Sequence, residues 1–349
     1  MVQESIFIDG PELSAIRATA KTAGVIVSVG LSEKARYSSG TLFNSNVLIG
    51  SDGEVLVHHR KLMPTFFEKL TWSPGDGYGL RVAETKWGRI GGLICGENTN
   101  PLARYALMAQ GEQVHVSTWP AVWPTRVPSG APTTPPPAAE TIAHTDSEEL
   151  APSAPARSGA ARDSGANRNR NYDNVTANRT RAAAHCFEAK CFGILCSSFL
   201  DAAAINIIAE GAPNPELVRA ALEQSPRGAS MFLDPTGAVL PAFTVDSDSD
   251  SAGRGEVKMR RKEGDMLQNE EGLLVADMDL EECVEGKQYH DVVGGYQRFD
   301  VFELRVDRRR REPAVFRDCG MHEGRAGEKG REKDGVTVAG ERGGGWEGA

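Results

Sequence analysis

The sequence predicts an α/β fold, and three features indicate it. Apolar runs at residues 25–30 (VIVSVG) and 193–198 (GILCSS) have the length and composition of buried strands. Stretches with a helical pattern alternate with such runs along the chain, as they do in layered α/β proteins. The length of 349 residues is enough for one large α/β domain or two ordinary ones.

The predicted elements follow one another in a regular order. A helix over residues 10–24 precedes a strand over 25–33, and a hairpin follows in which Ser51, Asp52 and Gly53 make the turn. The later predicted elements are a strand over 91–95, a helix from 100 to 111, a strand ending near 120, a helix around 178–190, and strands over 192–200, 229–235, 237–243 and 272–280.

Cys95 lies where the apolar strand GGLIC gives way to a helix with clear start signals. Asn100 is a good N-cap residue, Pro101 suits the first helical position, and Gly111 ends the element. Unpaired backbone N–H groups and the positive end of a helix dipole favour a thiolate and can hold a developing anion. We therefore interpret Cys95 as a candidate nucleophile, against the alternative that it packs in the core as a small apolar side chain.

Lys61 falls at the end of the second hairpin strand, and Glu68 follows seven residues later. Side chains at strand ends line the rim of a sheet, where sites are usually assembled. A lysine and a glutamate near a thiol supply a cation for developing negative charge and a carboxylate that orients the cation. The alternative is that both are solvated surface charges.

These motifs resemble the nitrilase and cyanide hydratase branch of the carbon–nitrogen hydrolase superfamily, in its fungal and bacterial forms. The resemblance is carried by HRKLMPT, the GDG at residues 75–77, and the run from GGLICGEN to STWP. It resumes over residues 172–204, 225–240 and 270–304. It implies a four-layer α-β-β-α sandwich that assembles into homo-oligomers.

The resemblance also implies roles for individual residues. Cys95 would be the nucleophile, Lys61 the catalytic lysine, and Glu68 the second, supporting glutamate of the site. Gly96 stands where many relatives carry Trp, which leaves the shape of the pocket open. We expect Glu97 to be a local hydrogen-bonding residue rather than a direct participant.

The implied chemistry is attack of the Cys95 thiolate on a nitrile carbon, followed by hydrolysis to a carboxylic acid and ammonia. Release of an amide, as in a cyanide hydratase, and hydrolysis of amides by the same residues are the alternatives within the enzyme class. A catalytically silent relative that serves as a subunit is the alternative outside it. The sequence has no P-loop or HExxH motif, and we expect no organic cofactor and no metal.

The beginning of the chain departs from the family pattern. Members carry a further glutamate, the general base, on a strand–loop that precedes the region matched here, so the chain reads as truncated at its N-terminus. Glu4, Asp9 and Glu12 flank the first helix and do not match that position. We therefore expect little nitrilase activity from this chain, because general base catalysis contributes about 10²–10⁴-fold.

The composition divides the chain into one catalytic domain and segments that do not read as folded. The domain is expected over residues 1–312, interrupted by a disordered, low-complexity insertion at 125–170 and a shorter one at 246–265. Residues 313–349 are rich in glycine and charge and are expected to be a disordered tail.

Charge and apolar pattern restrict the partners. A net charge of −9 argues against nucleic acid as a partner. No apolar run is long enough to span a membrane, and the first residues lack the basic-then-apolar pattern of a signal peptide. Cys186, Cys191 and Cys196 are spaced for packing rather than for zinc. We expect a cytoplasmic enzyme whose partners are a small nitrile or cyanide substrate and further copies of itself.

Overall fold

The computed structural model describes residues 2–38, 40–123, 172–247 and 259–314. By its internal contacts the chain has one compact unit over Met1–Arg311 and a second over Glu312–Ala349, nearly all of which is outside the described residues. The expected insertion at 125–170 and almost all of the expected tail at 313–349 also lie outside them.

The N-terminal part forms a helix on a three-stranded antiparallel sheet. Helix α1 (Pro11–Ala23) begins with a proline in its first turn and ends at Gly24, whose φ of 67° suits glycine. Strands β1 (Val27–Lys34), β2 (Leu42–Ile49) and β3 (Val55–Arg60) pair in that order. Leu13 and Ala20 of α1 pack against Val47 and Ile49 of β2, and the predicted helix, strand and hairpin are confirmed.

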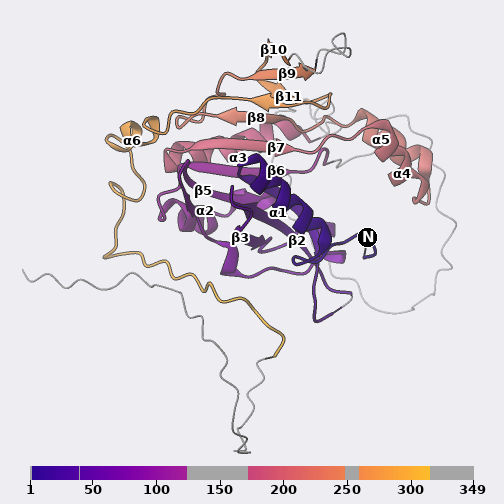
Figure 1. Ribbon diagram of the computed structural model, residues 1–349, viewed down its shortest axis with the longest axis horizontal. Coiled ribbons are helices and arrows are strands. Elements are labelled where there is room, and N and C mark those ends of the chain that lie inside the picture. Colours follow the sequence, from indigo (N-terminus) through magenta and orange to yellow (C-terminus); the bar gives the residue numbers. More distant parts are fainter. Residues whose placement is uncertain (1, 39, 124–171, 248–258, 315–349) are drawn as a thin grey trace, which may run out of the picture. The chain divides into compact units, whose positions relative to one another are not determined.

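A six-stranded sheet forms the larger part of the first unit (Figure 1). Its order is β11-β8-β7-β6-β5-β4, and β5, β6 and β7 are parallel. The strands are β4 (Ala83–Thr85), β5 (Gly88–Ile94), β6 (Val114–Trp119), β7 (Phe192–Ser197), β8 (Ser230–Leu233) and β11 (Met266–Leu267).

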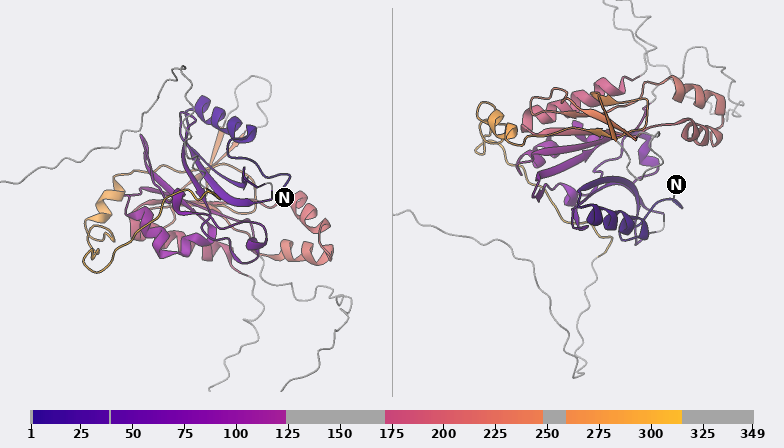
Figure 2. Two further views of the ribbon diagram at one scale, coloured as in Figure 1. Left: turned by 90° about the horizontal axis from the view of Figure 1, so that it is seen from below. Right: turned by 45° about the horizontal axis from the view of Figure 1, so that its top comes forward.

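Two helices cover one face of the larger sheet. Helix α2 (Pro101–Met108) packs on β5, and α3 (Asn174–Ala189) packs on β7 and β8. The Arg104–Glu188 ion pair joins the two helices. In Figure 2, right, the smaller sheet lies between the larger sheet and α1. A small cavity between the sheets is lined by Leu48 and Val57 from one and by Gly92 and Val116 from the other.

The C-terminal half departs from the sequence prediction in two strands. Residues 237–243 do not form the expected strand, because the Asp234 side chain accepts the N–H groups of Thr236 and Ala238 and closes a turn with Gly237 at φ 82°. The expectation that 246–265 is unfolded is wrong at both ends. Strand β9 (Phe243–Ser247) includes the first two of these residues, and it pairs with β10 (Met259–Glu263) and with β12 (Leu274–Val275).

Several short elements were not predicted. They are α4 (Ala202–Glu210), α5 (Pro215–Gln224), α6 (Glu282–Lys287), and the 3-10 turns η1 (Phe66–Leu70), η2 (Gly77–Gly79) and η3 (Cys95–Thr99). Of the helices that the structure describes, none is long and apolar enough to cross a membrane.

Candidate active site

Cys95 occupies a sharp elbow between a strand and a helical turn. Strand β5 ends at Ile94, and Cys95 follows with a φ of 51°, a left-handed conformation that costs a non-glycine residue energy. The chain then makes η3 before α2 starts at Pro101, capped by Asn100, whose side chain accepts the N–H groups of Leu102 and Ala103. The predicted cap is confirmed, but the short turn η3 separates the thiol from the start of α2.

Lys61 and Glu68 form a close ion pair. Lys61 directly follows β3, is only 1 % exposed, and its Nζ lies 2.6 Å from Glu68 Oε2. Glu68 also accepts the backbone N–H of Thr65, the cap residue of η1. Phe66, at the start of this turn, has a φ of 47°. Backbone strain of this kind clusters at functional sites, and here it occurs both at Cys95 and in the turn that carries Glu68. The alternative that Lys61 and Glu68 are solvated surface charges does not fit this burial.

Glu97 connects the Cys95 elbow with the end of the strand that precedes Lys61. Its Oε1 accepts the N–H of Leu62, the residue after Lys61, and its Oε2 accepts the N–H of Ile94 at 2.8 Å. His59 Nε2 lies 2.9 Å from the same Oε2. The expectation that Glu97 is a local hydrogen-bonding residue is confirmed, and its reach extends to the strand that carries Lys61.

The electrostatics of the thiol differ from the sequence expectation. Burial raises the pKa of Cys95; the Lys61 charge lowers it, the Glu68 charge raises it, and a hydrogen bond from the Gly96 backbone lowers it, with burial the largest effect. The elbow acts in the expected direction, because the Gly96 backbone hydrogen bond lowers the pKa, but burial outweighs it and the net shift is upward. Cys95 rests as a thiol, so a reaction at this sulfur requires a group that accepts its proton. The charges of Lys61 and Glu68 therefore both act on the sulfur, in opposite directions.

A row of buried polar side chains lies beneath the elbow. Asn98 donates from Nδ2 to the carbonyls of Cys95 (3.0 Å) and Leu93 (3.3 Å), and its Oδ1 lies 2.8 Å from His115 Nε2. His115 Nδ1 is 2.9 Å from Glu112 Oε1, and His185 Nε2 is 2.6 Å from Glu112 Oε2. Sequence reasoning missed these residues. The available signal was GEQVHV, in which Glu and His precede and enter a buried strand.

Part of the same row has the side-chain types and spacing of a metal site. One ligand atom from each of Glu112, His185 and Cys191 lies within 4.8 Å of the others, and all three residues are buried. Both Glu112 oxygens, however, already contact a histidine nitrogen. Burial and the neighbouring Cys186 also hold the pKa of Cys191 well above its usual range, which keeps a thiol rather than a metal-binding thiolate. We interpret the row as an ion-pair network.

Two of the three closely spaced cysteines have the packing role expected of them. Cys186 and Cys191 are fully buried in the core that α3 makes with β7 and β8. Cys196 differs, because its place near the end of β7 leaves it exposed.

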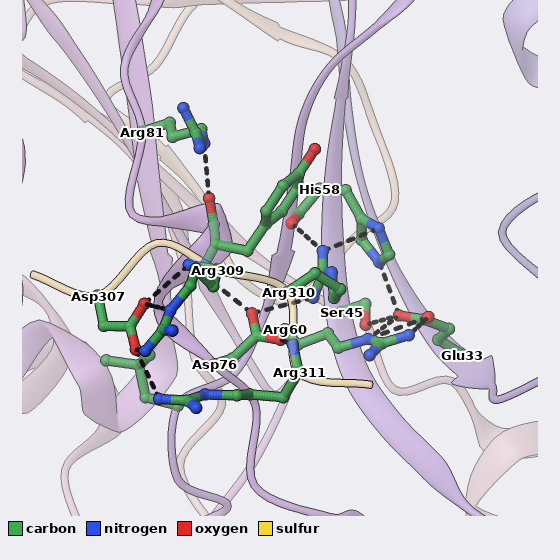
Figure 3. Close-up of polar contacts among 12 residues, drawn as sticks. Glu33, Ser45, His58, Arg60, Asp76, Arg81, Asp307, Arg309, Arg310 and Arg311 are labelled. Carbon is green, nitrogen blue, oxygen red and sulfur yellow. Dashed lines mark hydrogen bonds and ion pairs between the residues drawn. The ribbon is translucent and has the colours of Figure 1, made fainter. Parts of the chain in front are cut away.

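A second charged cluster fastens residues 302–311 to the smaller sheet. Figure 3 shows Arg310 between Asp76 and His58, and Glu33 facing both His58 and Arg60. Burial opposes ionisation of Glu33, but hydrogen bonds from His58 and Arg60 outweigh it and lower its pKa to about 2. Both Glu33 oxygens are engaged in this cluster.

Comparison with known proteins indicates the class of protein. Residues 1–134 match the model of the carbon–nitrogen hydrolase family. Nitrilase 2 from an unknown prokaryotic organism is 30% identical over 317 residues, which are 91% of this chain and 75% of that protein. Cyanide hydratase from Gibberella baccata is 30% identical over 89% of this chain and 69% of its own length. The chain belongs to the carbon–nitrogen hydrolase family, in its nitrilase and cyanide hydratase branch.

Other matches are more local or limited to the fold. Nitrilase 3 from an unknown prokaryotic organism is 43% identical over 120 residues, so the chain spans only 36% of that protein's length. The crystal structure of a carbon–nitrogen hydrolase from Helicobacter pylori G27 superposes with a TM-score of 0.50 at 16% identity, over 83% of this chain and 73% of that one. This similarity supports a shared α/β fold.

Proposed function

We propose that this chain is a thiol hydrolase of nitriles, with Cys95 as the nucleophile. One arrangement carries the proposal. Cys95 follows β5 in a strained backbone conformation, and the charges of the Lys61–Glu68 ion pair act on its sulfur. Two relatives over most of the chain are named nitrilase and cyanide hydratase, which supports a nitrile or cyanide as the substrate class.

The first step forms a covalent adduct. The Cys95 sulfur attacks the nitrile carbon, one π bond of the C≡N group breaks, and the thiol proton ends on the nitrogen, giving a thioimidate. Because Cys95 rests as a thiol, Glu68 is proposed to carry that proton: its Oε2 is bound to Lys61, and no hydrogen bond to Oε1 is found within the described residues. The Lys61 ammonium stabilises the negative charge that develops on nitrogen.

The adduct is then hydrolysed. Water adds to the thioimidate carbon, ammonia leaves, and the resulting thioester takes a second water to give a carboxylic acid and the free thiol. If the tetrahedral intermediate expels the Cys95 sulfur before ammonia, the product is an amide. That partition separates a nitrilase from a cyanide hydratase, and an amidase would enter the same sequence from the amide.

Turnover is proposed to be slow because few carboxylates are available to activate water. Glu33, Glu97 and Glu112 are buried and have both oxygens in hydrogen bonds or ion pairs. Glu68 must therefore both orient Lys61 and act as the base. General base catalysis contributes about 10²–10⁴-fold, so the covalent adduct should accumulate and turn over slowly.

The test combines intact mass with product analysis. Purified chain is incubated with an aliphatic nitrile, an arylacetonitrile and cyanide, and Cys95→Ala is the control. We expect a mass increase equal to one nitrile on the original chain, slow release of ammonia or amide, and neither with the Cys95→Ala variant. No adduct and no product with any substrate would favour the silent relative. Rapid turnover that disappears in Cys95→Ala would refute slow turnover and keep the hydrolase.

We also infer a four-layer α-β-β-α arrangement. Packing of α1 on the smaller sheet, packing of α2 and α3 on the larger one, and the cavity lined by both sheets support this order. Cross-linking of a cysteine pair introduced at Leu48 and Val116, which line that cavity, would test the contact between the inner layers.

Homo-oligomers are proposed from apolar exposure near the end of the first unit. Tyr289, Phe299 and Phe302 are each more than 70 % exposed. Light scattering after size exclusion should give a mass above that of one chain, and the pair Phe299→Asp and Phe302→Asp should reduce it. A wild-type monomer would refute the proposal.

A further inference from the structure

The buried row from Glu112 to Cys95 has a fixed direction of hydrogen bonding. Asn98 contacts two backbone carbonyls, those of Cys95 and Leu93, and carbonyl oxygens can only accept. The amide nitrogen of Asn98 must therefore face them, and its oxygen must face His115. His115 Nε2 consequently carries a proton, which it donates to Asn98 at 2.8 Å.

The other end of the row holds the second His115 nitrogen. Glu112 Oε1 lies 2.9 Å from His115 Nδ1, and Glu112 Oε2 lies 2.6 Å from His185 Nε2. Burial would raise the pKa of Glu112, but its interactions with His115 and His185 outweigh burial and lower the pKa to about 2. The His115 ring is therefore held at both nitrogens, by Asn98 at one and by Glu112 at the other.

The second histidine also contacts Glu112. Burial and the neighbouring His115 lower the pKa of His185 to about 4, so His185 is neutral and donates one proton to Glu112. No partner for His185 Nδ1 is found among the described residues, which agrees with an unprotonated nitrogen.

We propose that Asn98, His115 and Glu112 form a positioning chain for the nucleophile, in which Glu112 holds the His115 ring, His115 donates from Nε2 and so orients the Asn98 amide, and Asn98 holds the Cys95 elbow in its left-handed conformation. The proposal rests on the proposed function for its consequence in catalysis. All three side chains are at most 1 % exposed. Asn98 touches the backbone of the nucleophile, and His115 and Glu112 act through Asn98, so all three are positioning residues.

The energetic reason is the strain at Cys95. A non-glycine residue at positive φ costs of order 1–3 kcal/mol and persists only where its surroundings hold it. Asn98 supplies two hydrogen bonds to the carbonyls of Leu93 and Cys95, on either side of Ile94, and the hydrogen bond from His115 behind it prevents the amide from turning over.

The functional test replaces Asn98 by Asp, which keeps the shape but removes the two N–H donors. Alkylation of Cys95 by iodoacetamide should slow at least about tenfold, as expected for a displaced nucleophile, while the exposed Cys196 should react at its wild-type rate. If nitrile turnover is measurable, kcat should fall with KM unchanged. Alkylation does not depend on nitrile turnover, so failure of the proposed function leaves this test intact.

Gln110→Glu is the matched control. The Gln110 amide also donates to two backbone carbonyls, those of Leu80 and Ala106, and lies at the end of α2. This exchange should leave the Cys95 alkylation rate unchanged. An unchanged rate in Asn98→Asp, or equal slowing in both variants, would overturn the proposal.

A second measurement needs no folded Asn98 variant. Nitrogen-15 spectra of labelled histidines in the wild-type chain should show a proton on His115 Nε2 and on one nitrogen of His185. His115→Gln assigns the signal. A His115 whose Nε2 carries no proton would overturn the fixed direction of the chain.

Discussion

The Glu97 carboxylate accepts the backbone N–H of Leu62, across 35 residues of sequence, and so connects the turn that follows Cys95 to the end of the strand that delivers Lys61. The same carboxylate accepts the N–H of Ile94, the residue before Cys95. One buried side chain therefore fixes the two strand ends relative to each other.

Glu97→Gln should disrupt this connection. The amide nitrogen of Gln donates, so it cannot accept the N–H of both Leu62 and Ile94, and a buried donor without a partner costs about 1–3 kcal/mol. Chemical denaturation should report a loss of that size, together with slower alkylation of Cys95. Glu188→Gln is the control, because the partly exposed Arg104–Glu188 pair should contribute only about 0–1 kcal/mol. Equal losses in both variants would contradict the assignment.

Charges at the site should shift the thiol in opposite directions. Glu68 raises and Lys61 lowers the pKa of Cys95, so Glu68→Gln should lower that pKa and Lys61→Met should raise it. The pH dependence of iodoacetamide alkylation, read by mass at Cys95, gives both values. Lys86→Met, at a surface lysine over Trp87, is the control and should leave the profile in place. Shifts of the same sign in the two site variants would show that packing changes, not charge, control the thiol.

Local pattern predicted those features that depend on neighbours in sequence. The Asn100 cap, the first helix and the 51–53 turn follow from residues within a few positions of one another. The ends of β3 and β5 were predicted in the same way, and Lys61 and Cys95 directly follow them.

Features that depend on distant contacts were not predictable. The Glu97–Leu62 and Glu112–His185 contacts join residues 35 and 73 positions apart, and no periodicity indicates them. The direction of the Cys95 pKa shift was wrong for the same reason: burial is a property of the packed chain, and it exceeds the effect of the elbow. The strand β10 was missed because its sequence is charged and its stability comes from pairing with β9.

Acid should destabilise the chain through Glu33. The lowered pKa of about 2, against an ordinary value of 4.5, means that its stabilising contribution is fully present above pH 4.5 and is lost as pH falls toward 2. The loss should be about 3 kcal/mol. Denaturation measured from pH 6 to pH 2.5 should give a shallower pH dependence for Glu33→Gln than for wild type. The exposed Glu54→Gln should keep the wild-type slope; equal slopes in all three would contradict the prediction.

Asp76 should control how firmly residues 302–311 are attached. It accepts from the Arg310 side chain at 3.1 Å and from the Arg311 backbone N–H at 3.0 Å, and Arg310 also donates to the His58 carbonyl (Figure 3). Asp76→Asn removes the charge opposite Arg310, whose guanidinium is largely buried, and a buried charge without its partner is strongly destabilising. The segment should therefore open more often.

Trypsin provides the measurement, because Arg308–Arg311 are cleavage sites that must leave the surface to enter a protease. Cleavage there should accelerate in Asp76→Asn relative to wild type, by a factor that follows the population of the open segment. Asp300→Asn is the matched control. Asp300 forms an exposed ion pair with Arg298, two residues earlier in the chain, so this substitution should leave the cleavage rate unchanged. Cleavage that is equally fast in wild type and Asp76→Asn would show that the contacts of Asp76 do not hold the segment. Val306, which packs on the Leu80 and Leu93 cluster, would then be the remaining attachment.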